Sequence, residues 1–156
     1  MNHGLVHRHF GSKEGLLHAV MQHLADAVAG AMGPADPDEG LRAAMAAGMR
    51  STEAGDQHWR ILARLLLDGE DAGRLQGGYP TLERLLEAAR RDPALQGPGP
   101  EPEARVVLAT VYGLGVLLFG PFARAALELP DDRWDAIRRQ CDRLIIEALV
   151  PEAKPR

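Results

Sequence analysis

The chain has 156 residues and a formal net charge of −4, so it suits one domain and is no polycation that binds nucleic acid over its whole surface. A hydrophobic content of 46% supports a sizeable core. The single cysteine, Cys141, excludes a disulfide framework within the chain and fits a reducing compartment. We expect a cytoplasmic protein without a secretory signal, because no apolar region follows a basic stretch near residue 1.

The first predicted elements are two helices separated by a tight break. Residues 2–9 fit a short helix capped by Asn2, which the Phe-Gly-Ser sequence at 10–12 ends. Ser12 then caps a second helix over 13–32, whose apolar residues recur at steps of three and four. In this arrangement we expect Phe10 to pack inward.

The centre of the chain alternates helical periodicity with breakers. A Gly- and Pro-containing linker at 33–38 precedes a predicted helix over 38–50, which the residues 51–56 interrupt. Two more helices are predicted over 57–69 and 80–92, the first with Gly69 just after its end and the second with Pro80 near its first position. Alternating Pro and Gly predict a surface loop over 93–103.

Two long helices are predicted at the C-terminal end, over about 103–127 and 131–149. The uncharged stretch 106–123 reaches the minimum length of a membrane span, but its glycines and Pro121 favour a helix buried in protein. In the last helix, apolar residues at steps of three and four predict a packing seam. The seam consists of Trp134, Ile137, Cys141, Leu144 and Ala148. With no period-2 alternation and no internal repeat, the chain is predicted to be all-α, with about seven helices.

The sequence NHGLVHRHFGSKEGLLHAV, residues 2–20, resembles the TetR family of transcriptional repressors. In that family the stretch comprises the DNA recognition helix and the start of the helix that leads into the regulatory domain. Its matching residues are Asn2, Gly4, Val6, His9, Phe10, Ser12, Lys13, Glu14 and Leu16. His7 departs from the pattern, since the family has Tyr there. The resemblance implies a remnant of a helix-turn-helix domain at 1–15, a TetR-like helical regulatory domain at 16–150 and a tail at 151–156.

The resemblance also implies how residues 2–13 would contact operator DNA. A recognition helix places its N-terminal residues in the major groove, so Asn2, His3, Gly4 and Leu5 would lie nearest the bases. His7, Ser12 and Lys13 would contact phosphates, the second through the free amides at the start of the next helix.

Two other interpretations of these residues stay open. Lys13 and Arg8 are also typical of an ordinary solvated surface. His3 and His7, one helical turn apart, would bind a metal together with His9 or Glu14, although the spacing matches no established motif.

The resemblance further implies that roughly 40 residues which brace the recognition helix in the family do not precede Met1. A start codon assigned inside a longer reading frame and a real truncation both explain this, and the sequence does not separate them.

The long C-terminal helices are predicted to form a homodimer, because a helix that is apolar on two sides needs both a core and a partner. The interface residues we expect are Leu114, Leu118, Trp134, Ile137, Cys141 and Ile145. Each is equally typical of the core of a single subunit.

Aromatic and apolar residues with polar handles are candidates for an effector pocket, although an ordinary core has the same composition. These candidates are Met45, Met49, Trp59, Leu62, Leu66, Tyr79, Tyr112 and Phe119. Because no buried charge cluster is evident, a lipophilic effector is favoured over an anionic one.

The sequence thus favours a TetR-type DNA-binding regulator, most simply a repressor, that a small-molecule effector releases from operator DNA. The alternative is a helical dimer that acts without DNA and binds a small molecule or a full-length regulator. We expect no enzymatic activity, because no histidine lies near Cys141 in the sequence, and no cofactor, metal or membrane partner.

We expect residues 1–156 to bind operator DNA weakly or not at all, because an isolated helix as short as 2–9 is marginal in water. A mobility-shift assay measures this directly. Nanomolar, sequence-specific binding by the chain would contradict the expectation.

Overall fold

The structure, a computed structural model, describes residues 8–151, and every regular element among them is helical. This confirms the all-α fold class. The α-helices are α2 (Lys13–Ala31), α3 (Leu41–Ala54), α4 (Asp56–Leu67), α5 (Pro80–Arg91), α6 (Pro102–Ala126) and α7 (Asp131–Leu149), with short 3-10 helices at Ala72–Arg74 and Pro93–Leu95.

Local sequence signals set several of the helix ends. Ser12 caps α2 as predicted, and its Oγ accepts a hydrogen bond from the Gly15 amide at 3.0 Å. Pro80 occupies the first turn of α5, where its missing N–H costs nothing. Gly69 follows α4 with a φ of +88°, a left-handed conformation that favours glycine.

The predicted interruption at 51–56 is present but shorter than expected, because α3 continues to Ala54. Ser51 and Thr52 keep their hydroxyls within the helix, donating to the Gly48 carbonyl at 2.9 and 2.8 Å. The break is the single residue Gly55, which joins α3 to α4. A Cβ atom at Gly55 would collide with the Val28 side chain, so glycine permits this corner to lie against α2.

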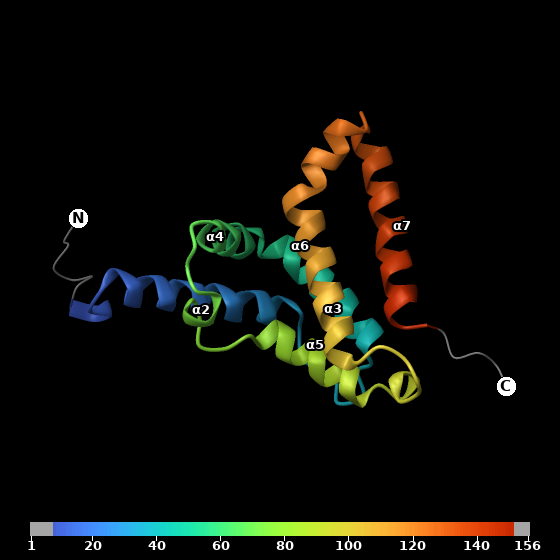
Figure 1. Ribbon diagram of the computed structural model, residues 1–156, viewed down its shortest axis with the longest axis horizontal. Coiled ribbons are helices and arrows are strands. Elements are labelled where there is room, and N and C mark those ends of the chain that lie inside the picture. The colour runs from blue at the N-terminus through green and yellow to red at the C-terminus, as the bar shows by residue number, and fades with distance from the viewer. Residues whose placement is uncertain (1–7, 152–156) are drawn as a thin grey trace.

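The helices α3 and α5 lie at the centre of the molecule, between α2 and α6. In Figure 1, α2 extends along the long axis toward the N-terminal end, while α6 and α7 form a helical hairpin toward the opposite end. The buried core lies where α3, α5, α6 and the end of α7 meet. Its members are Leu41, Ala44, Met45, Leu85, Ala88, Ala89, Val106, Ala109, Leu149 and Val150.

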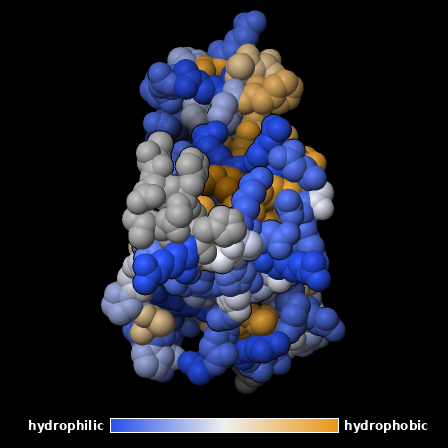
Figure 2. All heavy atoms as spheres, turned by 90° about the vertical axis from the view of Figure 1, so that its left-hand side faces the viewer, coloured by the Kyte–Doolittle hydropathy of each residue, from blue (hydrophilic) through white to orange (hydrophobic). Residues whose placement is uncertain are grey.

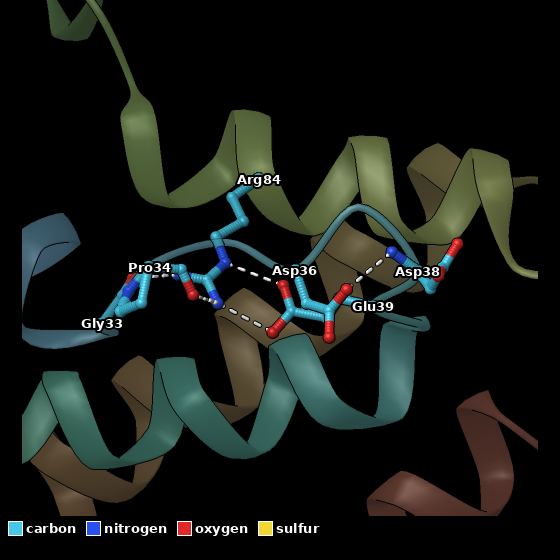
Figure 3. Close-up of polar contacts among 6 residues, drawn as sticks. All are labelled: Gly33, Pro34, Asp36, Asp38, Glu39 and Arg84. Carbon is cyan, nitrogen blue, oxygen red and sulfur yellow. Dashed lines mark hydrogen bonds and ion pairs between the residues drawn. The ribbon is translucent and has the colours of Figure 1, made fainter.

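The linker between α2 and α3 is fastened to α5 by Arg84 (Figure 3). The guanidinium binds both carboxylate oxygens of Glu39, at 2.8 and 2.7 Å, and Nη1 donates to the Gly33 carbonyl at 2.6 Å. The Arg84 and Glu39 side chains are only 14% and 10% exposed. Such a shielded, bidentate pair fixes the linker more firmly than a surface ion pair would.

Asp92, at the end of α5, caps the start of α3. Its Oδ2 accepts from the Leu41 amide at 2.9 Å and its Oδ1 accepts from the Ala94 amide at 3.0 Å. A Cβ atom at Gly40 would lie 2.8 Å from Asp92 Oδ2, so glycine lets the carboxylate approach this closely. The turn before α3 is therefore fixed to α5 at two points.

The predicted long apolar helix is present as α6, and within the single chain it is buried along one face only. One face packs on α3, α4, α5 and α7, and the other is exposed. By length and composition α6 also passes as a membrane span, and only 17% of its most apolar window is buried. One such helix is weak evidence for a span, and α7 beside it carries charged residues along its length.

We predict that Arg84→Ala lowers the free energy of unfolding by roughly 2–3 kcal/mol, because it leaves a shielded carboxylate unpaired. Chemical denaturation of both proteins measures the difference. The control is Arg91→Ala on the same helix, whose pair with Glu87 is exposed and should contribute below about 0.5 kcal/mol. Equal losses from the two variants would contradict a special role for Arg84.

Candidate functional site

Three neighbouring cavities lie along α6. The largest, which we call the outer cavity, has a volume of about 540 Å³ and lies between α3, α4, α6 and α7. The smallest, of about 50 Å³, shares Met49, Thr52 and Gly113 with it. The third, the inner cavity, has about 130 Å³ and lies between α2, α4, α5 and α6.

The outer cavity lies where α7 diverges from α6. At one end Trp134 packs on Gly120, where a Cβ atom would lie 3.0 Å from the indole. At the other end Arg105 is buried and donates to the Leu149 carbonyl, and Arg42 donates to the Val150 carbonyl at 2.7 Å. Trp134 and Arg105 thus join α6 to α7 near the two ends of this helix pair, and Arg42 joins α3 to the residue after α7.

Several polar groups in the outer cavity are paired with one another or with neighbours. The Tyr112 hydroxyl donates to Asp142 at 2.6 Å, and burial, together with this carboxylate, raises the pKa of Tyr112. Arg124 forms an ion pair with Asp131, and Arg60 forms one with Asp56. Carboxylates therefore offset much of the positive charge around this cavity.

The inner cavity is more apolar and includes the wall of α2. Apolar and small residues make up much of its lining, together with several side chains that carry a polar group. Its lining comprises Ala25, Val28, His58, Trp59, Leu62, Leu66, Gln76, Tyr79, Pro80, Thr81, Leu82, Thr110 and Leu114. Five of these, from Trp59 to Leu114, also line the smallest cavity, so the inner and smallest cavities are adjacent.

His58, Trp59 and Gln76 are the buried polar side chains of the inner cavity. The His58 and Trp59 rings meet edge to face, with centroids 4.6 Å apart. Burial lowers the pKa of His58, so the imidazole is neutral near pH 7. Neither His58 nor Gln76 belongs to a periodic apolar stripe, so the sequence pattern does not mark them as pocket residues.

The loop that carries Gln76 is tied to α2. Gln22 Oε1 accepts from the amides of Gly77 and Gly78, at 2.8 and 3.1 Å. The Gln22 Nε2 donates to Asp26 at 2.9 Å, which orients the side-chain amide. One residue of α2 therefore holds the loop that forms part of the inner cavity.

Seven of the eight residues predicted for an effector pocket line these cavities. Met45 lines the smallest cavity, Tyr112 lines the outer cavity, and Met49 lines both of them. The inner cavity is lined by Trp59, Leu62, Leu66 and Tyr79. Phe119 does not line them, because it lies on the face of α6 that points away from α3 and α7 and is 68% exposed.

Of the predicted DNA-contact residues, Ser12 and Lys13 are described, and both are exposed at the start of α2. Asn2, His3, Gly4, Leu5 and His7 lie outside the described residues. Phe10 is 41% exposed, so the expectation that it packs inward is wrong within residues 8–151. The end of the molecule where α2 begins is largely hydrophilic (Figure 2).

The residues predicted for a dimer interface are all half-buried within one chain. Leu114 lines the two smaller cavities, Trp134 lines the outer one and Ile145 packs against the core. These three positions favour the core interpretation that the sequence left open. Leu118, Ile137 and Cys141 lie at the border of the exposed surface.

A different set of apolar side chains is fully at the surface. We call it the α6 stripe, and its members lie on one face of the helix. They are Val107, Leu108, Val111, Phe119 and Phe122, between 52% and 74% exposed. On α7, Leu144 of the predicted seam is 65% exposed. Sequence periodicity did not distinguish this face, because α6 is apolar all round.

Within the described residues, no group of three or more His, Cys, Asp or Glu side chains is placed to hold a metal ion. The predicted alternative of a site at His3 and His7 falls outside that part of the chain.

Known proteins of similar sequence share most of this chain's length. An HTH-type transcriptional regulator of Mycobacterium bovis and an HTH-type transcriptional repressor of Mycobacterium tuberculosis are each 32% identical to it over 155 residues. The alignment covers 97% of this chain and 73% of each relative. No family model and no solved structure matches the chain.

Proposed function

Because the chain belongs to the HTH-type transcriptional regulators, we propose that it is a TetR-type repressor released from DNA by a small molecule bound within its helical body. The observation that carries the proposal is the double role of α2. This helix begins at Ser12 and Lys13, which the family resemblance assigns to DNA phosphates, and it forms a wall of the inner cavity through Ala25 and Val28. A molecule in that cavity contacts the helix that leads to the DNA.

The proposed repressor acts as a homodimer through α6 and α7. The α6 stripe supports this, because a contiguous exposed apolar surface marks an interaction site. A two-fold axis beside α6 and α7 would pair each stripe with its copy in a four-helix interface. The charged residues of α7 favour a protein partner over lipid for this surface.

We predict that Phe119→Glu raises the dimer dissociation constant about a hundredfold or more, because a symmetric interface buries the new charge twice. Sedimentation at micromolar concentration measures the effect. The control is Leu67→Glu, since Leu67 is 85% exposed on α4 and lies outside the stripe. A wild-type chain that sediments as a monomer contradicts the proposed dimer.

The regulatory role is tested by comparing transcripts in strains that lack the chain, carry it, or carry Lys13→Ala. Because residues 1–156 alone are expected to bind operator DNA weakly, each strain that carries the chain has it extended at its N-terminus by the bracing helices of the family. We expect the extended wild-type chain to restore repression and Lys13→Ala to restore it only in part, because the variant loses a phosphate contact. Lys154→Ala, which alters the chain's other lysine, is the control. Identical transcripts in all strains contradict the proposal. Repression without DNA binding in a mobility-shift assay favours the alternative, in which the chain acts through a full-length regulator.

A further inference from the structure

The inner cavity combines apolar walls with three buried polar atoms that lack a partner. His58, Trp59 and Gln76 are 2%, 9% and 7% exposed. Their atoms His58 Nδ1, Trp59 Nε1 and Gln76 Oε1 have no hydrogen-bond partner among residues 8–151. A buried polar atom that is left unpaired in the interior destabilises the folded protein. Three of them around one cavity indicate a place where an occupant supplies the missing bonds.

The hydrogen-bonding character of two of these atoms is settled by chemistry and geometry. Gln76 Nε2 donates to the Gly78 carbonyl at 2.8 Å, which leaves Oε1 as an acceptor in need of a donor. Trp59 Nε1 only donates. A hydroxyl group does both, so one group on a ligand can serve this pair.

Charge distinguishes the inner cavity from the rest of the interior. No Lys or Arg lines it. The buried cations lie elsewhere and are engaged, Arg84 by Glu39 and Arg105 by the Pro100 and Leu149 carbonyls. A carboxylate transferred into this cavity would lose its hydration without gaining a counter-ion, which is strongly unfavourable. These conditions select a neutral ligand.

Size limits the ligand further. The inner cavity of about 130 Å³ is close to the roughly 150 Å³ of an apolar cavity that accommodates benzene. The adjacent cavity of about 50 Å³, which shares Trp59 and Leu114 with it, leaves room for a small substituent.

We propose that the effector is a neutral monocyclic aromatic alcohol or phenol, whose ring fills the inner cavity and whose hydroxyl bonds to Gln76 and Trp59. This inference rests on the proposed function, which supplies the small-molecule effector. It places that molecule beside Gln22, through which the Gln76 loop is tied to α2.

The test uses three probes of one shape: toluene, p-cresol and 4-methylbenzoate. Calorimetry on the full chain should show p-cresol binding about tenfold or more tightly than toluene, since the hydroxyl gains hydrogen bonds worth about 1.4 kcal/mol. The chain should bind 4-methylbenzoate at least tenfold more weakly than p-cresol. Tightest binding of 4-methylbenzoate, equal binding of toluene and p-cresol, or no binding of any probe at millimolar concentration overturns the proposal.

Two variants test whether the preference for p-cresol over toluene arises in the inner cavity. Gln76→Leu removes the acceptor and Trp59→Phe removes the donor, and each should reduce the preference for p-cresol over toluene to about threefold or less while toluene still binds. Gln57→Leu is the matched control, because Gln57 is exposed on α4 beside His58, and it should keep the full preference. Loss of the preference in Gln57→Leu, or its retention in both cavity variants, overturns the assignment.

The outcomes separate this inference from the function on which it rests. If repression depends on Lys13 but the chain shows no preference among the three probes, only the proposed ligand class is overturned. Clear preference for p-cresol with transcripts that do not respond to the chain overturns the repressor function and leaves the binding site.

Discussion

The arrangement of this molecule depends on how the segment between α2 and α3 is held against α5. That segment is rich in Gly, Pro and Asp and has no regular structure of its own. Arg84 binds Glu39 and the Gly33 carbonyl at one end, and Asp92 receives the Leu41 amide at the other. Because both contacts come from α5, the directions of α2 and α3 are set relative to the same helix. The inner cavity, which α2, α4, α5 and α6 enclose, exists only in that arrangement.

The same constraint relates the interior to the end of the molecule where α2 begins. α2 is anchored at its C-terminal end by the linker and along its length by Gln22, which holds the Gln76 loop. The first part of α2 extends away from these anchors (Figure 1), and Ser12 and Lys13 at its start are exposed. The Gln76 loop therefore contacts the middle of the same helix whose first residues are exposed.

Buried charge is present in this protein, although the sequence suggested none. Arg84, Asp92 and Arg105 lie in the interior or close to it, each satisfied by carbonyls, amides or a carboxylate. Their partners lie up to 51 residues away in the chain, and for Arg105 the partner carbonyl of Leu149 is 44 residues away. No local pattern reveals such pairs. The inner cavity has no Lys, Arg, Asp or Glu in its lining, and these three buried charges instead hold loops and helix ends in place.

By itself the sequence determined the features that depend on interactions between residues close together in the chain. Periodicity located the helices, and Ser12, Gly69 and Pro80 marked helix ends through their own hydrogen bonds and backbone preferences. The interruption at 51–56 was expected to be too long, because Ser51 and Thr52 break helices only when their hydroxyls compete with the backbone, and here they bond back to Gly48. The tertiary structure alone decided which side of α6 faces inward. An all-apolar helix has no preferred side, so packing against α3, α5 and α7 left Phe119 and Val111 at the surface and turned Gly113 and Leu114 toward the cavities.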